Sequence, residues 1–405
     1  MLAVLTTRAQ LPFLQALQHL HFFDLRVYRQ AASVVNGDHS LYGLRLRRGL
    51  AFTYPPFAAL CFVPLSWLSV HRTELLVAMA NILLVAATAH AVIRLPRPTD
   101  ARPVGSAAGW LIAAVALWTQ PVSWAIGYGQ IDLLIAALVT VDLAYGSRTR
   151  LGGIGIGLAA ALKLTPLIFI PYLLFSGRRA MAGRATGTFL LSIAVGLAAM
   201  PRATLSYWGG RFLNVSHLTG RHHAPGGGPA DQSLRGALMR LLEHGPLPNW
   251  LWLLACLLVG LTGLLLAVRA ARRGDHAWGF LLTAVTGLLI SPVSWTHHWA
   301  IAVPGVLALL AGRRRSFTLP LLAALVAGFM LDGYAIYLVS IWSPTGLHLE
   351  GAVLLVSDLY VLGGLGTLLF AAGNELRSAL PKTKEPAINS FLRVLLTNTE
   401  VASTG

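Results

Sequence analysis

The sequence predicts an all-α polytopic membrane protein with about eleven transmembrane helices. Three properties of the composition indicate this class. Of the 405 residues, 56% are hydrophobic and only 11% are charged, and the mean hydropathy is +0.66. A soluble globular chain carries roughly a quarter charged residues, because its surface faces water. The composition therefore excludes a soluble enzyme, a disordered protein and a coiled coil.

Long apolar runs follow one another along the chain. A bilayer core of about 30 Å requires around 20 apolar residues per helix. On that basis the predicted spans are 52–70, 74–94, 107–126, 129–146, 152–175, 185–200, 250–268, 277–291, 298–311, 317–340 and 351–372.

The basic residues indicate how these spans are oriented. The net charge is +16, and arginines cluster in short connections at 178–184, 269–273 and 313–315. Such clusters are typical of cytoplasmic loops. Nucleic-acid-binding proteins instead gather basic residues on one water-exposed face, so no nucleic-acid partner is expected. This orientation places the long loop 201–249 and the turn 292–297 on the outer face.

Three regions follow from this organisation. Residues 1–51 form an N-terminal region with an outer loop that carries Asp24. Residues 52–372 form the transmembrane domain, which includes loop 201–249. Residues 373–405 are polar and are predicted to be a disordered cytoplasmic tail.

Charged and imidazole side chains at membrane depth are costly, so each is a functional candidate. The predicted spans and their edges contain Asp132, Asp142, Lys163, His297, His298, Asp332 and Asp358. Lys163 lies too deep in its apolar run to reach an interface, and Pro166 bends the helix beside it.

His297 and His298 are adjacent, so on a helix they point about 100° apart and do not share one metal as an i,i+4 pair does. No metal site is predicted. An imidazole beside a phosphate is the favoured interpretation of this pair.

Asp24 lies in HFFDLRVYRQA (21–31), among aromatic residues that suit the membrane interface. A lone aspartate there is ordinarily an exposed carboxylate at a helix N-terminus. The neighbouring segment FTYPPFAAL (52–60) favours a functional interpretation. Its two prolines begin a span, and we expect Tyr54 to point back toward Asp24.

Six segments occur in one order, and together they resemble glycosyltransferase family 87, the actinobacterial polyprenol-phosphate-mannose-dependent α-(1→2)-mannosyltransferases. The segments are DLRVY (24–28), FTYPPFAA (52–59), GQIDLLIAAL (129–138), ALKLTPLIF (161–169), ADQSLRGAL (230–238) and SPVSWTHHW (291–299). The resemblance implies the GT-C fold and an extracytoplasmic active site in the plasma membrane. It also implies a polyprenyl-phosphate-sugar donor in the bilayer and a glycolipid or lipoglycan acceptor, without a cofactor.

The resemblance further implies the roles of individual residues. Asp24 matches the presumed catalytic base of the family. The substrate-binding residues implied by the matching segments are Arg26, Tyr28, Tyr54, Gln130, Lys163, Gln232, His297 and His298. Members of that family have a full membrane span before the aspartate motif, whereas residues 1–20 here are too polar to predict one.

Two other functions are compatible with parts of the pattern. A secondary transporter would relay protons through Asp132, Lys163 and Asp358, but the chain lacks the internal repeat that is common in such proteins. An inactive lipid-binding homologue is the other alternative. For the transferase, no second carboxylate accompanies Asp24, which favours a single displacement with inversion at the sugar carbon.

Overall fold

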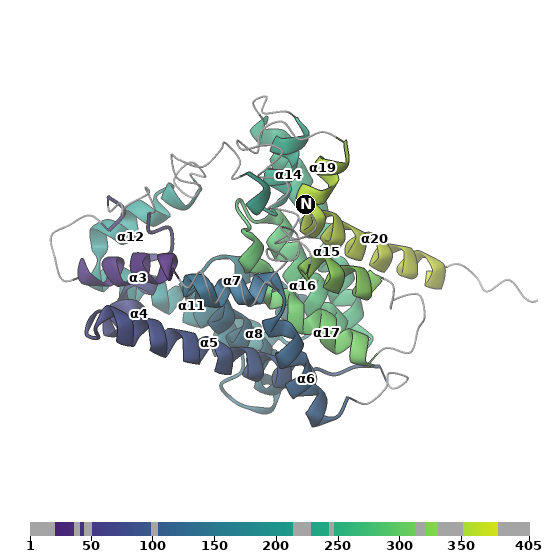
Figure 1. Cartoon of the computed structure of the whole chain (residues 1–405). Helices are drawn as coiled ribbons and strands as arrows, with labels where there is room; N and C mark the ends of the chain where they lie inside the picture. Colours follow the sequence, from purple (N-terminus) through teal and green to yellow (C-terminus); the bar gives the residue numbers. More distant parts are fainter. Residues whose placement is uncertain are drawn as a thin grey trace, which may run out of the picture.

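The computed structural model describes residues 21–35, 41–43, 51–98, 104–213, 228–242, 247–312, 321–330 and 351–379. Within these ranges the regular structure is helical, and the pairing of Asp231 with Trp295 is an isolated β-bridge. Figure 1 shows the helices packed into one bundle, with α3 lying across it. The all-helical class is therefore confirmed for the described part of the chain.

The helices of the first half are α3 (Phe23–Ser33), α4 (Pro56–Ser66), α5 (Val70–Val92), α6 (Ser106–Leu117), α7 (Gln120–Tyr128), α8 (Asp132–Tyr145), α9 (Ile154–Leu162), η3 (Thr165–Ile168), α10 (Phe169–Phe175) and α11 (Arg179–Ala199). The second half contains α12 (Pro201–Trp208), α14 (Leu234–Leu241), α15 (Asn249–Arg272), α16 (His276–Ile290), η6 (Thr296–Ile301), α17 (Ala302–Gly312), α19 (Gly351–Ser357) and α20 (Leu359–Ala379).

Four helices of the described residues are long and apolar enough to cross a membrane: α5, α11, α15 and α20. A fifth span results if α6 and α7, which meet at a bend of 71°, are taken together. A bilayer tolerates such helices because each satisfies its own backbone hydrogen bonds. The chain is therefore a multi-pass membrane protein. Several other predicted spans, such as 52–70 and 277–291, form shorter apolar helices.

Two predicted spans are not continuous helices. The span 107–126 breaks between α6 and α7, where Pro121 occupies the first turn of α7. The span 152–175 breaks at Lys163, which is extended and lies three residues before Pro166, and η3 begins at Thr165. Proline has no N–H and disfavours the helical conformation in the residue before it. The structure thus divides the predicted span 107–126 into two helices, and the break after Lys163 lies where the sequence predicted a bend beside Pro166.

The C-terminal boundary also differs from the prediction. α20 continues to Ala379, so residues 373–379 are helical and not part of a disordered tail. Glu375 on this last turn pairs with Arg273, with 2.7 Å between Arg273 Nη2 and Glu375 Oε2. The basic end of α15 therefore meets the end of α20. The rest of the tail lies outside the described residues, as do Asp332 and most of the predicted span 317–340.

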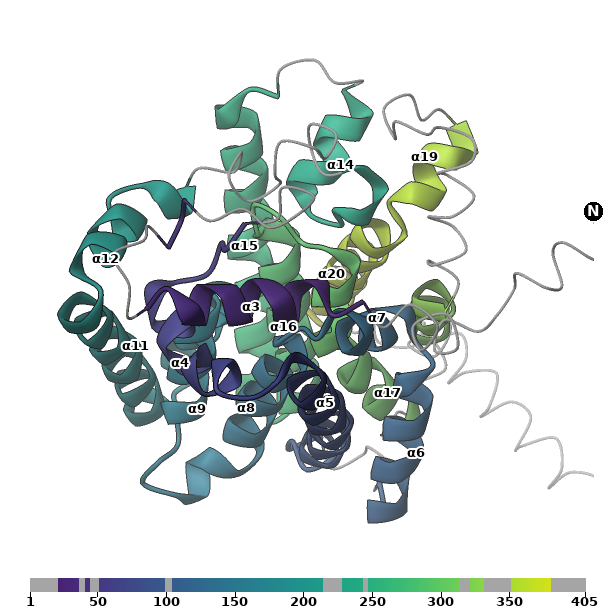
Figure 2. The same cartoon turned by 60° about the vertical axis from the view of Figure 1, so that its left-hand side comes forward.

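Figures 1 and 2 show α3 lying against α4 and α7, above α5 and α8. The Phe22 N–H donates to the Gly127 carbonyl at the end of α7. Helices α11 and α12 lie to one side of the bundle, and α17 lies to the other. The centre of the bundle consists of α8, α9, α16 and η6, whose side chains are mostly buried.

Asp142 caps the start of α9 and so stabilises the fold. Its carboxylate accepts the N–H groups of Gly153 at 2.8 Å and Ile156 at 2.9 Å, which are donors that the start of α9 leaves unpaired. Asp142→Ala should lower the free energy of unfolding by about 1–3 kcal/mol, because buried donors lose their acceptor. Thermal unfolding in detergent measures this loss. Asp142→Asn keeps an acceptor oxygen and should lose less. Equal stability of all three proteins would contradict this capping role.

Candidate active site

Helix α3 presents two different faces to its surroundings. Asp24 and Tyr28 are four residues apart and therefore lie on the same face of the helix. Arg26 is rotated about 200° from Asp24, because each residue turns the helix by about 100°. Its side chain is 55% exposed, and Arg26 Nη2 lies 3.4 Å from Glu74 Oε1. The structure thus places Arg26 outside the site, in contrast to the role that the resemblance implies.

Gln130 joins the inward face of α3 to the start of α4. The Tyr28 hydroxyl donates to Gln130 Oε1 at 2.6 Å, and the Tyr54 hydroxyl donates to the same oxygen at 3.3 Å. The two tyrosine hydroxyls are 3.0 Å apart. Gln130 is also hydrogen-bonded to the carboxyl of Asp24. Tyr54 therefore lies in the cluster that contains Asp24, as expected from the sequence.

Gln130 is held in place by a turn between α7 and α8. Gly129 has φ 68°, and a Cβ at this position would lie 2.8 Å from Leu25 Cβ. Glycine tolerates this left-handed conformation and leaves room for α3. The Asn81 side-chain amide also donates to the Gln130 carbonyl at 3.3 Å.

The pKa of Asp24 lies near neutrality. Burial raises it from 3.8 to about 6, while the hydrogen bond from Gln130 and the charge of Lys163 act in the opposite direction. A carboxylate with such a pKa accepts a proton more readily than an ordinary aspartate, yet stays ionised at neutral pH. Asp24 therefore has the protonation behaviour of a general base.

Lys163 meets a carboxylate that the sequence analysis did not include in the site. Its Nζ lies 2.6 Å from Oδ1 of Asp132, which begins α8 and is buried. The extended backbone at Lys163 directs the side chain away from α9, and Nζ also lies 5.8 Å from the centre of the Tyr54 ring. The sequence identified Asp132 as a costly polar residue at membrane depth and as a member of the proton relay in the transporter alternative, but not as a residue of the transferase site. Its partner is 31 residues away, beyond any local pattern.

The two histidines complete the cluster from η6. His297 packs against Tyr128, with ring centres 5.5 Å apart, and against His298 at 4.8 Å. The segment is fixed by Thr296 Oγ1, which accepts from Gln120 Nε2 at 3.2 Å. Six predicted residues besides Asp24 thus converge with it: Tyr28, Tyr54, Gln130, Lys163, His297 and His298. Of the two histidines, His298 faces a pocket.

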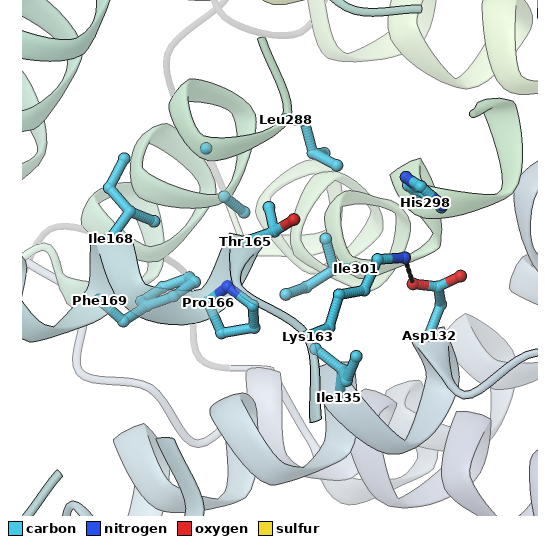
Figure 3. Close-up of a pocket in the computed structure, with 12 residues that line it drawn as sticks. Asp132, Ile135, Lys163, Thr165, Pro166, Ile168, Phe169, Leu288, His298 and Ile301 are labelled. Carbon is cyan, nitrogen blue, oxygen red and sulfur yellow. Dashed lines mark hydrogen bonds and ion pairs between the residues drawn. The ribbon is translucent and has the colours of Figure 1, made fainter. Parts of the chain in front are cut away.

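The pocket beside Lys163 has a polar end and an apolar end. The pocket together with the open space at its mouth measures about 390 Å³. Figure 3 shows Lys163 pointing to Asp132, with His298 close by at the same end. Ile168 and Phe169 line the other end, and the apolar side chains of Leu288 and Ile301 lie nearer to His298 and Lys163. A ligand with a charged head and a hydrocarbon tail fits this division.

Asp132, His297 and His298 form the one group in the described residues with the composition of a metal site. One ligand atom from each lies within 4.8 Å of the others. The sequence predicted no further metal-ligating residue beside the two histidines. In the structure, Asp132 of α8 lies beside them. The ammonium of Lys163, 2.6 Å from Asp132 Oδ1, would repel a cation at this place. An anion fits this arrangement better than a metal ion.

Gln232 lies in a second network, which supports the histidine segment. Its backbone N–H donates to Ser294 O at 2.7 Å, and its side-chain amide donates to Ser357 O at 2.6 Å. No contact between Gln232 and the Asp24 cluster is found among the described residues. Asp358 belongs to the same network, where it forms a buried ion pair with Arg240 and does not join Lys163. The structure therefore separates Gln232 and Asp358 from the Asp24 cluster.

The site combines a half-buried carboxylate, Asp24, with a lysine, Lys163, and the imidazoles of His297 and His298. Such groups in a helical membrane protein are typical of membrane enzymes that transfer groups by acid–base chemistry. The profile of glycosyltransferase family 87 matches residues 52–292. The chain belongs to this family of glycosyltransferases.

Characterised relatives support this assignment. The chain is 32% identical to the polyprenol-phosphate-mannose-dependent alpha-(1-2)-phosphatidylinositol mannoside mannosyltransferase of Mycobacterium tuberculosis, over 76% of this chain and 74% of the relative. The protein of the same name from Mycolicibacterium smegmatis is 31% identical, over 80% and 76%. A pentamannoside mannosyltransferase from Mycobacterium tuberculosis is 32% identical, over 73% and 68%.

Proposed function

We propose that the protein transfers a mannosyl residue from a polyprenyl-phosphate-mannose donor to a mannosylated phosphatidylinositol, forming an α-(1→2) linkage. The observation that carries this proposal is the single cluster in which two groups meet at Tyr54: Asp24, through its hydrogen bond with Gln130, and Lys163, whose Nζ lies 5.8 Å from the centre of the Tyr54 ring. The names of the relatives supply the two substrates. The full chain then has the GT-C fold, with about eleven spans.

The reaction needs one base and one anion site. Asp24 takes the proton from the attacking hydroxyl of the acceptor. The oxygen of that hydroxyl bonds to carbon 1 of the sugar, and the bond from carbon 1 to the donor phosphate oxygen breaks. The leaving phosphate keeps the electron pair, and Lys163 and His298 stabilise its charge. A single displacement converts a β-linked donor to an α-linked product.

We place the site at the outer surface of the plasma membrane. α11 begins at the basic cluster near Arg179 and ends at Ala199, about 30 Å further along. It leads directly into α12, which packs against α4 near Tyr54. Arg272 at the end of α15 donates to the Phe175 carbonyl, so two basic clusters lie at the same end of the bundle. Basic ends face the cytoplasm, and the site lies toward the other end.

Activity should depend on pH through Asp24. The base must be ionised, so kcat/KM should fall as the pH drops through about 6 and level off above it. Gln130→Met removes a hydrogen bond that lowers the pKa of Asp24, and should move the acid limb to higher pH. The pH profile of kcat/KM measures both effects. An acid limb that stays in place in Gln130→Met would separate Asp24 from this titration.

The function is tested with purified protein in lipid nanodiscs, polyprenyl-phosphate-mannose and a phosphatidylinositol mannoside. Mass spectrometry should detect addition of one hexose, and linkage analysis an α-(1→2) bond. Transfer should persist in EDTA, because Lys163 and His298 provide the charge at the phosphate. Absence of transfer would favour the inactive lipid-binding alternative. Loss of transfer in EDTA with recovery on adding Mg²⁺ or Zn²⁺ would assign a metal to Asp132 and the histidines.

A further inference from the structure

We propose that a second pocket, between α4, α11 and α12, binds an acyl chain of the acceptor lipid. This inference rests on the proposed function. The pocket together with the open space at its mouth measures about 210 Å³, so it holds part of one chain, and its walls include Phe57, Phe189, Gly196, Thr204 and Trp208. It is separate from the pocket beside Lys163, because the two share no residue.

The surroundings of this pocket favour a lipid as the occupant. α11, which forms one wall, turns large apolar side chains outward: Leu190 is 56% and Leu191 63% exposed. These side chains face the hydrocarbon of a bilayer in a multi-pass protein, so a chain enters the pocket without crossing water. Thr204 is 2% exposed, and no described residue pairs with its hydroxyl oxygen. A buried hydroxyl of this kind suits the ester group at the head of an acyl chain.

The position of the pocket assigns it to the acceptor and not to the donor. Its wall begins at Pro55, directly after Tyr54, and Tyr54 belongs to the hydrogen-bonded group around Asp24. The acceptor must bring its hydroxyl to Asp24. The polyprenyl tail is covalently bound to the phosphate that we place at Lys163 and His298, so its own pocket is the one beside these residues. Figure 2 shows α11 and α12 on one side of α3, opposite α17.

A cation near the same pocket complements the phosphate of the acceptor. Arg211 follows Trp208 closely in sequence and lies over the Tyr42 ring, 5.2 Å from its centre. Among the described residues no carboxylate is within ion-pair distance of Arg211. The Tyr42 hydroxyl donates to the Tyr54 carbonyl at 2.9 Å, which links this aromatic surface to the site. A phosphate at Arg211 thus lies between an acyl chain in the pocket and a headgroup at Asp24.

Two glycines of α11 provide a matched pair of variants. A Cβ at Gly196 would lie 3.2 Å from Thr204 Oγ1, so Gly196→Leu places its side chain in the pocket. Gly187 has nothing within 4 Å of such a Cβ, and Gly187→Leu leaves the pocket unchanged. With polyprenyl-phosphate-mannose as donor, Gly196→Leu should raise the KM for diacylated phosphatidylinositol mannoside about tenfold or more. The KM for the donor should stay constant, and Gly187→Leu should behave as wild type.

The deacylated headgroup of the same acceptor is the control substrate. Its KM should be equal in wild type and Gly196→Leu, because it has no chain to displace. A rise in the donor KM, an equal effect on both acceptors, or no effect on either would overturn the acceptor pocket. If wild type transfers no sugar, the proposed function fails, and kinetics no longer address the pocket.

A binding measurement on the wild-type protein tests the pocket even if the wild type transfers no sugar or the Gly196→Leu variant misfolds. The probe is a mannosylated phosphatidylinositol with a photoreactive group in the acyl chain, reconstituted with the intact protein. Crosslinks should map to peptides of α11 and α12 around Phe189 and Trp208, and an excess of unmodified lipid should remove them. Crosslinks confined to the pocket around Ile168 and Leu288, or spread evenly over the apolar surface, would refute the assignment.

Discussion

Asp24→Asn should lower the rate of sugar transfer by at least about 100-fold, the usual contribution of a positioned general base. The amide keeps the shape of the carboxyl and one acceptor oxygen, but it accepts no proton from the acceptor hydroxyl. Donor binding should be unchanged, because Lys163 and His298 are intact. Single-turnover transfer and donor binding, measured in the same nanodisc preparation, separate these two effects.

Arg26→Gln is the control for this prediction. Arg26 lies two residues away on the same helix, but it points outward to Glu74. An exposed ion pair contributes little to stability, so this variant should transfer sugar at nearly the wild-type rate. Normal turnover of Asp24→Asn would refute the role of Asp24. A large loss in Arg26→Gln would instead return Arg26 to the site, as the family resemblance implies.

Lys163→Met should lower the transfer rate by about 100- to 1000-fold, the range found when one donor to a developing negative charge is removed. It should also destabilise the protein by roughly 3–5 kcal/mol, because Asp132 is left as a buried carboxylate without its partner. The two effects require separate measurements: transfer rate on folded protein and thermal unfolding in detergent.

The double variant Lys163→Met with Asp132→Asn distinguishes structure from chemistry. It removes both charges of the buried pair, so most of the lost stability should return. The transfer rate should stay low, because no cation faces the leaving phosphate. Recovery of activity together with stability would show that Lys163 acts only by neutralising Asp132.

Several features of the site were predictable from the sequence because their signals are local. Two prolines at the start of α4 and the aromatic residues around Asp24 identified the segments that contribute Asp24 and Tyr54. A lysine in the middle of an apolar run is costly wherever it lies, which identified Lys163. The outward direction of Arg26 was also predictable, because a helix over residues 23–33 rotates Arg26 away from Asp24.

Other features depend on contacts between distant segments. The network of Gln232 and the pairing of Asp358 with Arg240 join residues more than 100 positions apart. A sequence motif records that a residue type occurs, but not which neighbour takes its hydrogen bonds. The resemblance therefore placed Gln232 with the substrate, whereas its side chain is hydrogen-bonded to the backbone around α20.

The sequence by itself determined the class of the protein, because hydrophobicity is a sum over local composition, and a bilayer selects apolar helices irrespective of how they later pack. It also determined most residues of the site through short motifs in a fixed order. Only the tertiary structure decided how they combine: Asp132 with Lys163 and the histidine pair, and Gln130 between two tyrosines and Asp24. The physical reason is that a charge is tolerated in a membrane interior only when packing brings its partner within a few ångströms, and packing is a property of the whole chain.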